Sequence, residues 1–230
     1  MADPVEMKLL HMITADPART PTFTLFADSN YFLFAGAANC NSPCTTEPPG
    51  FAWNHGDVQS DIVTTWLGMV GPGVAQVGVD SETWTDHTDI RPTMMVLLGL
   101  NDDYQHDGRL IFEDLNGYAV PAAVHKGEGI VRQLAEAYKR INAPVGQLGL
   151  ASLVISTRAL ESGNATDDTT YANLENQLVS FTSRRNGLAS QMKTMLENAA
   201  FNGQPIDKKQ AQSLIDQANQ LLNDVTEAAE

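Results

Sequence analysis

The clearest hydrophobic pattern lies near the end of the chain, where apolar residues recur every three or four positions. The final stretch spaces them 3-4-3-4, at Ala211, Leu214, Ala218, Leu221 and Val225. This spacing places one apolar stripe along one face of a helix. Asp207, three residues before Gln210, is a residue type that caps the first backbone amides of a helix. The pattern therefore predicts a final helix that begins at about Asp207.

Two earlier stretches carry the same kind of stripe. One holds Val131, Leu134, Tyr138 and Ile141, and the other holds Leu174, Leu178, Phe181, Leu188, Met192 and Met195. Such stripes match the packing of antiparallel bundles, so residues 126–230 are predicted to form three or four packed helices. A coiled-coil partner site is the alternative. Arg185 interrupts the second stripe, which is consistent with an interface, a salt bridge to Glu175 or Glu197, or a surface arginine.

The first part of the chain has a different hydrophobic pattern, because turn-forming residues separate short runs of strand character. The runs cover residues 22–26, 31–34 and 76–79. Helices are predicted over residues 5–14 and from Asp89 to Gly99, where Pro92 suits a first turn and Gly99 suits an end. Alternating strands and helices predict an α/β layered domain over residues 1–125.

The distribution of charged residues also changes near residue 125. The formal net charge is −14, and residues 1–125, with 16 acidic and four basic residues, contribute −12 of it. This asymmetry favours a first domain at 1–125 and a helical extension at 126–230. So negative a charge argues against nucleic-acid-backbone binding, which needs clustered Lys and Arg. No apolar run approaches the ~20 residues of a membrane span, and residues 1–6 lack the features of a signal peptide.

Only two cysteines occur, Cys40 and Cys44, in a loop rich in Asn, Ser, Thr and Pro. Two thiols cannot complete a four-ligand zinc site, and their CxxxC spacing differs from the CxxC redox motif. A short-loop disulfide, two free thiols and a metal role are all open. A disulfide would indicate an oxidising compartment.

Candidate chemistry centres on a histidine that precedes a glycine, His55-Gly56. A glycine lets the backbone approach another group closely, so the imidazole could reach a buried cation; the alternative is a hydrogen-bonded histidine in a turn. Asp57 and Asp61 could orient that histidine, or could be ordinary surface carboxylates. Asp89 is interpreted as a structural residue that caps the helix it begins. No HExxH, GxGxxG, Walker A or GxSxG motif is present.

One ordered set of motifs resembles a known family. The set comprises His55-Gly56, Gly71-Pro-Gly73, Asp89-Ile-Arg-Pro-Thr93, Gly99 and Gly108-Arg109. In this order the motifs resemble the C-terminal half of the alkaline phosphatase superfamily, and most closely its nucleotide pyrophosphatase/phosphodiesterase branch. The resemblance covers roughly residues 1–115 and implies the C-terminal half of an alkaline-phosphatase-like α/β/α sandwich, followed here by the helical extension.

The resemblance also implies chemistry. Such enzymes use two divalent metal ions, usually zinc, and form a covalent phospho-enzyme on a Thr or Ser nucleophile. His55 matches the last metal ligand along the chain, whereas the nucleophile and the other ligands lie upstream of the region that this chain resembles. The expected function is thus the C-terminal portion of a phosphoester hydrolase, inactive alone, acting on a small phosphoester and located outside the cytoplasm in its full-length form. A non-catalytic helical interaction protein is the alternative.

Overall fold

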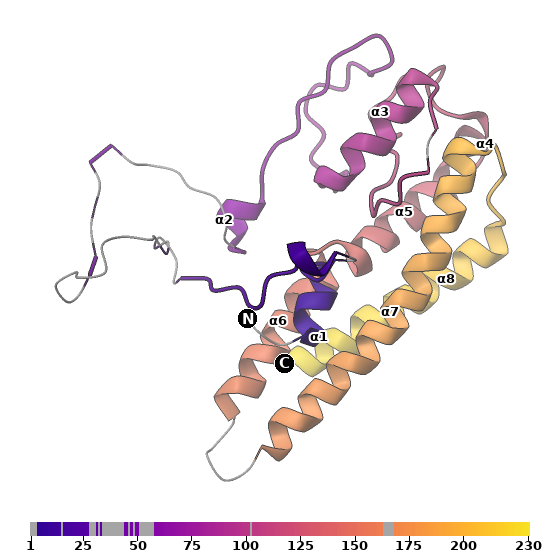
Figure 1. Cartoon of the computed structure of the whole chain (residues 1–230). Coiled ribbons are helices and arrows are strands. Elements are labelled where there is room, and N and C mark those ends of the chain that lie inside the picture. The colour runs from indigo at the N-terminus through magenta and orange to yellow at the C-terminus, as the bar shows by residue number, and fades with distance from the viewer. Residues whose placement is uncertain are drawn as a thin grey trace.

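Helices dominate the part of the chain that the structure describes. The computed structural model describes residues 4–14, 16–27, 31, 33, 44–45, 47, 49–50, 58–101, 103–162 and 168–230. Four long helices lie side by side as a bundle (Figure 1). They are α5 (Glu128–Asn142), α6 (Gln147–Ser162), α7 (Thr169–Phe201) and α8 (Lys208–Ala229). The helical bundle predicted for residues 126–230 is confirmed.

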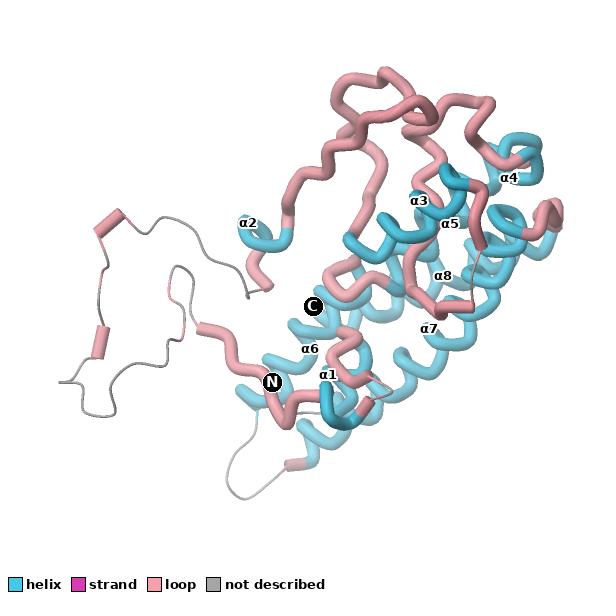
Figure 2. The backbone as a smooth tube through the Cα atoms, turned by 45° about the horizontal axis from the view of Figure 1, so that its top comes forward, coloured by secondary structure: helices cyan, strands magenta, loops and turns pink. Residues whose placement is uncertain are grey.

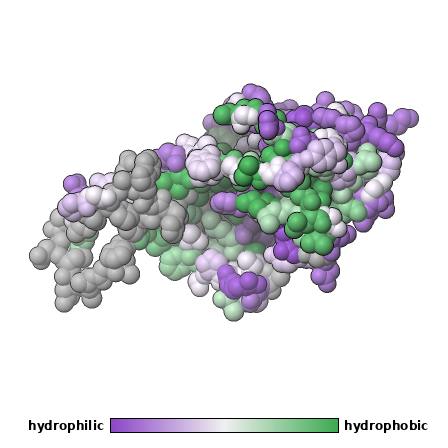
Figure 3. All heavy atoms as spheres, turned by 90° about the horizontal axis from the view of Figure 1, so that it is seen from above, coloured by the Kyte–Doolittle hydropathy of each residue, from purple (hydrophilic) through white to green (hydrophobic). Residues whose placement is uncertain are grey.

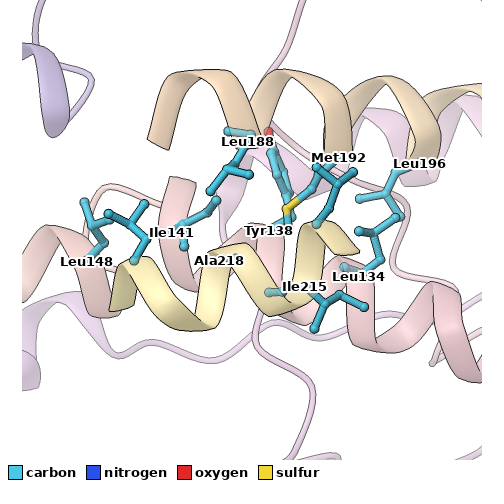
Figure 4. Packing of buried hydrophobic residues seen from close by; sticks show 14 of the residues in the cluster. Leu134, Tyr138, Ile141, Leu148, Leu188, Met192, Leu196, Ile215 and Ala218 are labelled. Atoms are coloured by element: carbon cyan, nitrogen blue, oxygen red, sulfur yellow. The ribbon is translucent and has the colours of Figure 1, made fainter. Parts of the chain in front are cut away.

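The predicted stripes face the interior of this bundle. In α5 the four stripe residues are at most 1% exposed, and in α8 all five are buried. Side chains of α5, α7 and α8, with Leu148 from α6, meet in one core (Figure 4). Each of these helices is amphipathic, so burying the stripe removes its apolar surface from water while the polar face remains hydrated.

Short connections set the order of the helices. Residues 143–146 join α5 to α6, and residues 202–207 join α7 to α8. In the second connection Gly203 has a φ of 62°, a left-handed conformation that glycine adopts without a steric penalty. The carboxylate of Asp207 accepts hydrogen bonds from the backbone amides of Lys209 and Gln210, which confirms the predicted cap.

The first half contributes short elements. These are α1 (Pro4–Leu9), a 3-10 turn at Pro17–Arg19, α2 (Ser60–Val63), a 3-10 turn at His87–Asp89, α3 (Ile90–Leu98) and α4 (Ala122–Lys126). α1 packs on α6 and α7, and Leu110 and Phe112 join the same hydrophobic cluster as the bundle. Figure 2 shows α3 beside the bundle, with long loops leading to and from it. The helix predicted over residues 5–14 is shorter than expected, because it ends before His11, which has a φ of 57°.

The α/β prediction for residues 1–125 is wrong for the part that the structure describes. Residues 22–26 and 76–79, which were expected to form strands, have no strand conformation in the described part of the chain, and the expected run 31–34 lies partly outside the described residues. Within the described ranges the sole bridge pairs Val74 with Leu115 in antiparallel fashion. Strand character in a sequence produces a sheet only where a second strand lies alongside, and the described residues include no such second strand. The alkaline-phosphatase-like sandwich is therefore not observed.

None of the described helices is both long enough and apolar enough to cross a lipid bilayer.

The cap of α8 gives a first test of this fold. Asp207→Ala removes the acceptor for two backbone amides and should lower the free energy of unfolding by about 1 kcal/mol in urea titrations. Asp207→Asn keeps an amide oxygen at the same place and should retain most of that stability. Equal losses in the two variants would contradict the capping role.

Candidate functional site

Two of the motif blocks behind the family resemblance, Asp89–Thr93 and Gly108-Arg109, meet around one buried carboxylate, that of Asp89. The side chain of Asp86 accepts from the backbone amide of Thr88, while the carboxylate of Asp89 accepts from the amide of Asp86 at 3.0 Å. Each residue thus satisfies an amide that the start of a helix leaves unpaired, which is a capping box. Asp89 occupies the N-cap position of α3, but its side chain makes no cap hydrogen bond there; its carboxylate instead completes the capping box of the 3-10 turn, whose N-cap is Asp86, so the expectation that Asp89 caps the helix it begins is wrong.

Asp89 also holds the Gly-Arg motif in place. Its Oδ1 accepts from the backbone amide of Arg109 at 2.7 Å, and its side chain is fully buried. Gly108 lies against the backbone of Thr88 so closely that an added Cβ would overlap the Thr88 carbonyl oxygen. A glycine before the arginine is therefore a steric requirement of this contact.

Thr93, the last residue of the Asp-x-x-Pro-Thr motif, completes the connection. Its hydroxyl donates to the backbone oxygen of Asp89 at 2.7 Å and accepts from the amide of Ile111 at 2.9 Å. The α3 helix then ends at Gly99, which has a φ of 64° in the left-handed region, as the sequence predicts. The spacing of this motif is thereby explained by hydrogen bonds between its own members and residues 109–111.

The Gly-Pro-Gly segment joins the same unit through side-chain hydrogen bonds. Asn116 Nδ2 donates to the carbonyl oxygens of Val74, at 2.9 Å, and Pro72, at 3.3 Å, and the Tyr118 hydroxyl donates to the same Pro72 oxygen. Gly73 packs directly against Leu97 of α3. Residues 71–74, 86–99 and 108–118 thus form one connected unit, which we call the motif unit.

A lysine from the bundle pairs with two carboxylates of this unit. Lys139 of α5 places its Nζ 2.6 Å from Asp89 Oδ1 and 3.1 Å from Asp86 Oδ2, and lies 5.8 Å from the centre of the Trp84 ring. Burial raises the pKa of Asp89, whereas the positive charge of Lys139 lowers it. The carboxylate is fully used by hydrogen bonds and an ion pair, so its role is to hold the unit together.

Arg109 is enclosed rather than presented to solvent. Its Nη1 lies 2.6 Å from Glu113 Oε2, and its Nη2 donates to the Trp84 carbonyl oxygen at 3.3 Å. Both charged side chains are about 4% exposed. The small cavity that Arg109 lines with His106 and Tyr138 measures about 10 Å³, too little for a phosphoester. The arginine therefore positions neighbouring backbone in this arrangement.

The residues predicted to bind metal are placed only in part. His55 and Asp57 lie outside the described residues. Asp61 lies in the first turn of α2 and is exposed. Cys44 is disulfide-bonded, but Cys40, the other cysteine in the sequence, lies outside the described residues. The pairing and the roles of these residues remain predictions.

The described side chains do not assemble a metal centre. Within the described ranges, no group of three or more His, Cys, Asp or Glu side chains lies close enough together to hold a metal ion. These side chains therefore do not fit the two-zinc site that the resemblance implies. The predicted metal ligands would have to come from other parts of the protein, His55 among them.

A second polar cluster, absent from the sequence predictions, surrounds Arg185. This side chain is 3% exposed and donates from Nη1 to Asn142 Oδ1 and to His11 Nε2, each at 3.0 Å. His11 in turn lies 3.4 Å from Asp107, and its hydrogen bond lowers the pKa of that carboxyl. Arg185 thus fastens the turn after α1 to the bundle, in place of the salt bridge to Glu175 or Glu197 that the sequence left open. A charged residue inside an apolar stripe was the signal that could have identified this cluster.

Removing Lys139 should destabilise the whole chain. Lys139→Met leaves Asp89 buried without its cation, and we expect a loss of about 3–5 kcal/mol in the free energy of unfolding. Arg132→Met, which removes a half-exposed cation of the same helix, should cost well under 1 kcal/mol.

The same variant should show a defined pH dependence. Without Lys139 the pKa of Asp89 rises further, and a carboxyl with a raised pKa costs stability once it ionises. The deficit of Lys139→Met should therefore shrink as the pH is lowered towards the acidic range and grow as the pH rises. Urea titrations across that range would contradict this account if the deficit were constant.

The close approach at Gly108 gives a steric test. Gly108→Ala should force the Gly-Arg segment away from Thr88 and lower the melting temperature by several degrees. Gly129→Ala, in open space on α5, should leave stability unchanged or raise it by about 0.5–1 kcal/mol. Thermal unfolding followed by circular dichroism would distinguish the two, and equal behaviour would exclude the predicted clash.

The chain was compared with known protein families, curated proteins and solved structures. No family model, curated protein or solved structure matches the chain. The family resemblance therefore rests on the ordered motifs alone.

Proposed function

We propose that this chain forms part of a metal-dependent phosphoester hydrolase of the phosphodiesterase/nucleotide pyrophosphatase type. The observation that carries the proposal is the motif unit. Motifs that are weak individually occur in the order that the family uses. Two of the blocks, Asp89–Thr93 and Gly108-Arg109, are in contact at Asp89, and Gly71-Pro-Gly73 contacts the α3 helix through Leu97. A fixed order together with spatial connection is harder to obtain by chance than order alone.

In this proposal the chain's residues have two roles. The motif unit serves as a support, because Asp89 is paired with Lys139, and Glu113 with Arg109, inside the protein. His55, seventeen residues before Pro72, is the candidate ligand for one of two divalent ions, with Asp57 and Asp61 orienting it. The nucleophile and the remaining ligands would come from residues outside those that the structure describes.

Two further observations bear on the proposal. The disulfide at Cys44 supports an oxidising, extracytoplasmic location. The sandwich that the resemblance implied is not observed, so the proposal depends on the motifs and takes no support from the fold.

A second candidate is a helical interaction protein without catalysis. It is favoured by the bundle of α5–α8, whose core is continuous and whose surface grooves between α7 and α8 are lined mostly by amides and hydroxyls. Such surfaces are suited to contacts with another macromolecule and offer no described acid–base pair for catalysis.

Turnover of a chromogenic ester separates the two candidates. The protein expressed from its complete reading frame should hydrolyse bis(p-nitrophenyl) phosphate in the presence of Zn²⁺. His55→Ala should lower kcat/KM by at least about 100-fold and release zinc, because a metal site that loses a ligand loses affinity.

The matched control is His125→Ala, which removes a half-exposed histidine of α4 and should leave turnover and zinc content unchanged. Equal activities for the two variants would remove His55 from the metal site. A folded protein with neither turnover nor bound zinc would contradict the hydrolase and leave the interaction protein.

A further inference from the structure

Three asparagines in this chain are followed directly by a glycine: Asn116, Asn186 and Asn202. Asparagine is thermolabile, because the backbone amide nitrogen of the next residue can attack the side-chain amide and expel ammonia. A following glycine has no Cβ to obstruct that approach. The attack requires rotation about ψ of the asparagine, so the surrounding backbone decides whether the reaction proceeds in the folded protein.

Asn186 lies in the interior of α7, and the helix protects it. Asn186 and Gly187 are both exposed, so exposure alone does not make such a pair reactive. In a helix the amide of Gly187 donates to the carbonyl oxygen four residues earlier, and rotation at residue 186 would break α7 in two. The break would also disturb the core, because the adjacent residues Arg185 and Leu188 are buried.

Asn116 is protected by its own hydrogen bonds. Its Nδ2 donates to the carbonyl oxygens of Val74, at 2.9 Å, and Pro72, at 3.3 Å. Its backbone amide donates to the carbonyl oxygen of Gly73 at 2.9 Å. The leaving group and the backbone are therefore both held in the motif unit, and the attack would have to break these bonds first.

Asn202 lacks this protection. It follows the last residue of α7, and both it and Gly203 are exposed. Neither the Gly203 amide nor Oδ1 of Asn202 has a hydrogen-bond partner in the described part of the chain. Rotation at residue 202 breaks the bond from the Gln204 amide to the Asn198 carbonyl oxygen and the exposed bond from Asn202 Nδ2 to Asn198 Oδ1. Opening is therefore confined to the connection between α7 and α8.

This connection is also accessible to water. Figure 3 shows mostly hydrophilic side chains at the right-hand end of the molecule, the end at which α7 and α8 are joined in Figure 1. Apart from its chain neighbours, no described atom lies within 4 Å of the position that a Cβ of Gly203 would occupy. Water, the co-reactant that completes the conversion, can therefore reach the pair.

We propose that Asn202 is a site of spontaneous conversion to aspartate and isoaspartate in the folded protein. In the first step the Gly203 nitrogen bonds to Cγ of Asn202, the Cγ–Nδ2 bond breaks, and ammonia leaves with the proton that Gly203 loses. In the second step water adds to one carbonyl of the cyclic imide and breaks its bond to the Gly203 nitrogen, which regains a proton. Attack at Cγ gives aspartate, and attack at the main-chain carbon gives isoaspartate.

The conversion adds a carboxylate where the structure disfavours one. The carbonyl end of α7 carries partial negative charge, which repels a new negative charge at residue 202. The isoaspartate product also lengthens the main chain of the connection by one carbon. Gln204, Pro205 and Asp207 line the groove between α7 and α8 at this end, so the groove gains a carboxylate in addition to that of Asp207.

Peptide mapping of the full-length chain tests the proposal. Trypsin places the three pairs on separate peptides, residues 110–126, 186–193 and 194–208. After incubation of the folded protein at neutral to mildly alkaline pH, conversion in peptide 194–208 should be at least about 10-fold faster than in the other two. In concentrated guanidinium chloride, where the fold is lost, the three rates should agree within about 3-fold. A sample digested without incubation corrects for conversion during digestion.

Three outcomes would overturn the proposal. They are equal rates at the three sites of the folded chain, a slower reaction at Asn202 than at Asn116 or Asn186, and an absence of conversion at Asn202. The same selectivity in denaturant would also overturn it, because the preference would then come from the local sequence and not from the fold.

Two variants test the site and the cost of its conversion. Asn202→Gln keeps a neutral amide but would have to close a larger ring, so it should abolish conversion in peptide 194–208. Asn202→Asp reproduces one of the products and should raise the equilibrium constant for unfolding about 2–5-fold relative to Asn202→Gln. Persistent conversion in the peptide of Asn202→Gln, or equal stability of the two variants, would contradict the account.

Discussion

The ion pair between Lys139 and Asp89 is the contact on which the position of the motif unit against the bundle depends. Asp89 lies at the start of α3 and receives hydrogen bonds from residues 86 and 109, while Lys139 belongs to the bundle. A buried pair of this kind adds little net stability, but the loss of one partner leaves an uncompensated charge. The pair therefore specifies one arrangement of the motif unit on α5 and excludes others.

This arrangement limits what the motif unit can do. Asp89, Arg109 and Glu113 are buried and paired, so none of them is available to a substrate as an acid, a base or an anion-binding group. Within the unit, residues 86–99 and 108–118 hold residues 71–74 in place. That segment is anchored on one side and open on the other, where the uncharged residues before it are exposed.

The sequence predicted the helical half well and the first half poorly, for identifiable reasons. The stripes of α5 and α8 are regular, because one face of each helix is buried and the other is hydrated. The α6 helix was not identified as a separate element: apolar residues such as Leu150 and Val154 occur on its exposed face, which weakens the periodic signal. The strands expected in the first half depend on partners distant in the sequence, which a local pattern cannot show. His55 and Asp57 remain predictions, and the exposure of Asp61 does not decide their role.

By itself, the sequence determined the features that depend on neighbouring residues: the helical stripes, the cap at Asp207, and the end of α3 at Gly99. Each follows from side chains and backbone within one or two turns. Only the tertiary structure decided that Gly108 must be a glycine, that Arg185 is buried beside His11, and that Lys139 meets Asp89 fifty residues away. These features depend on which distant surfaces come into contact, and burial then fixes the partner that each polar group needs.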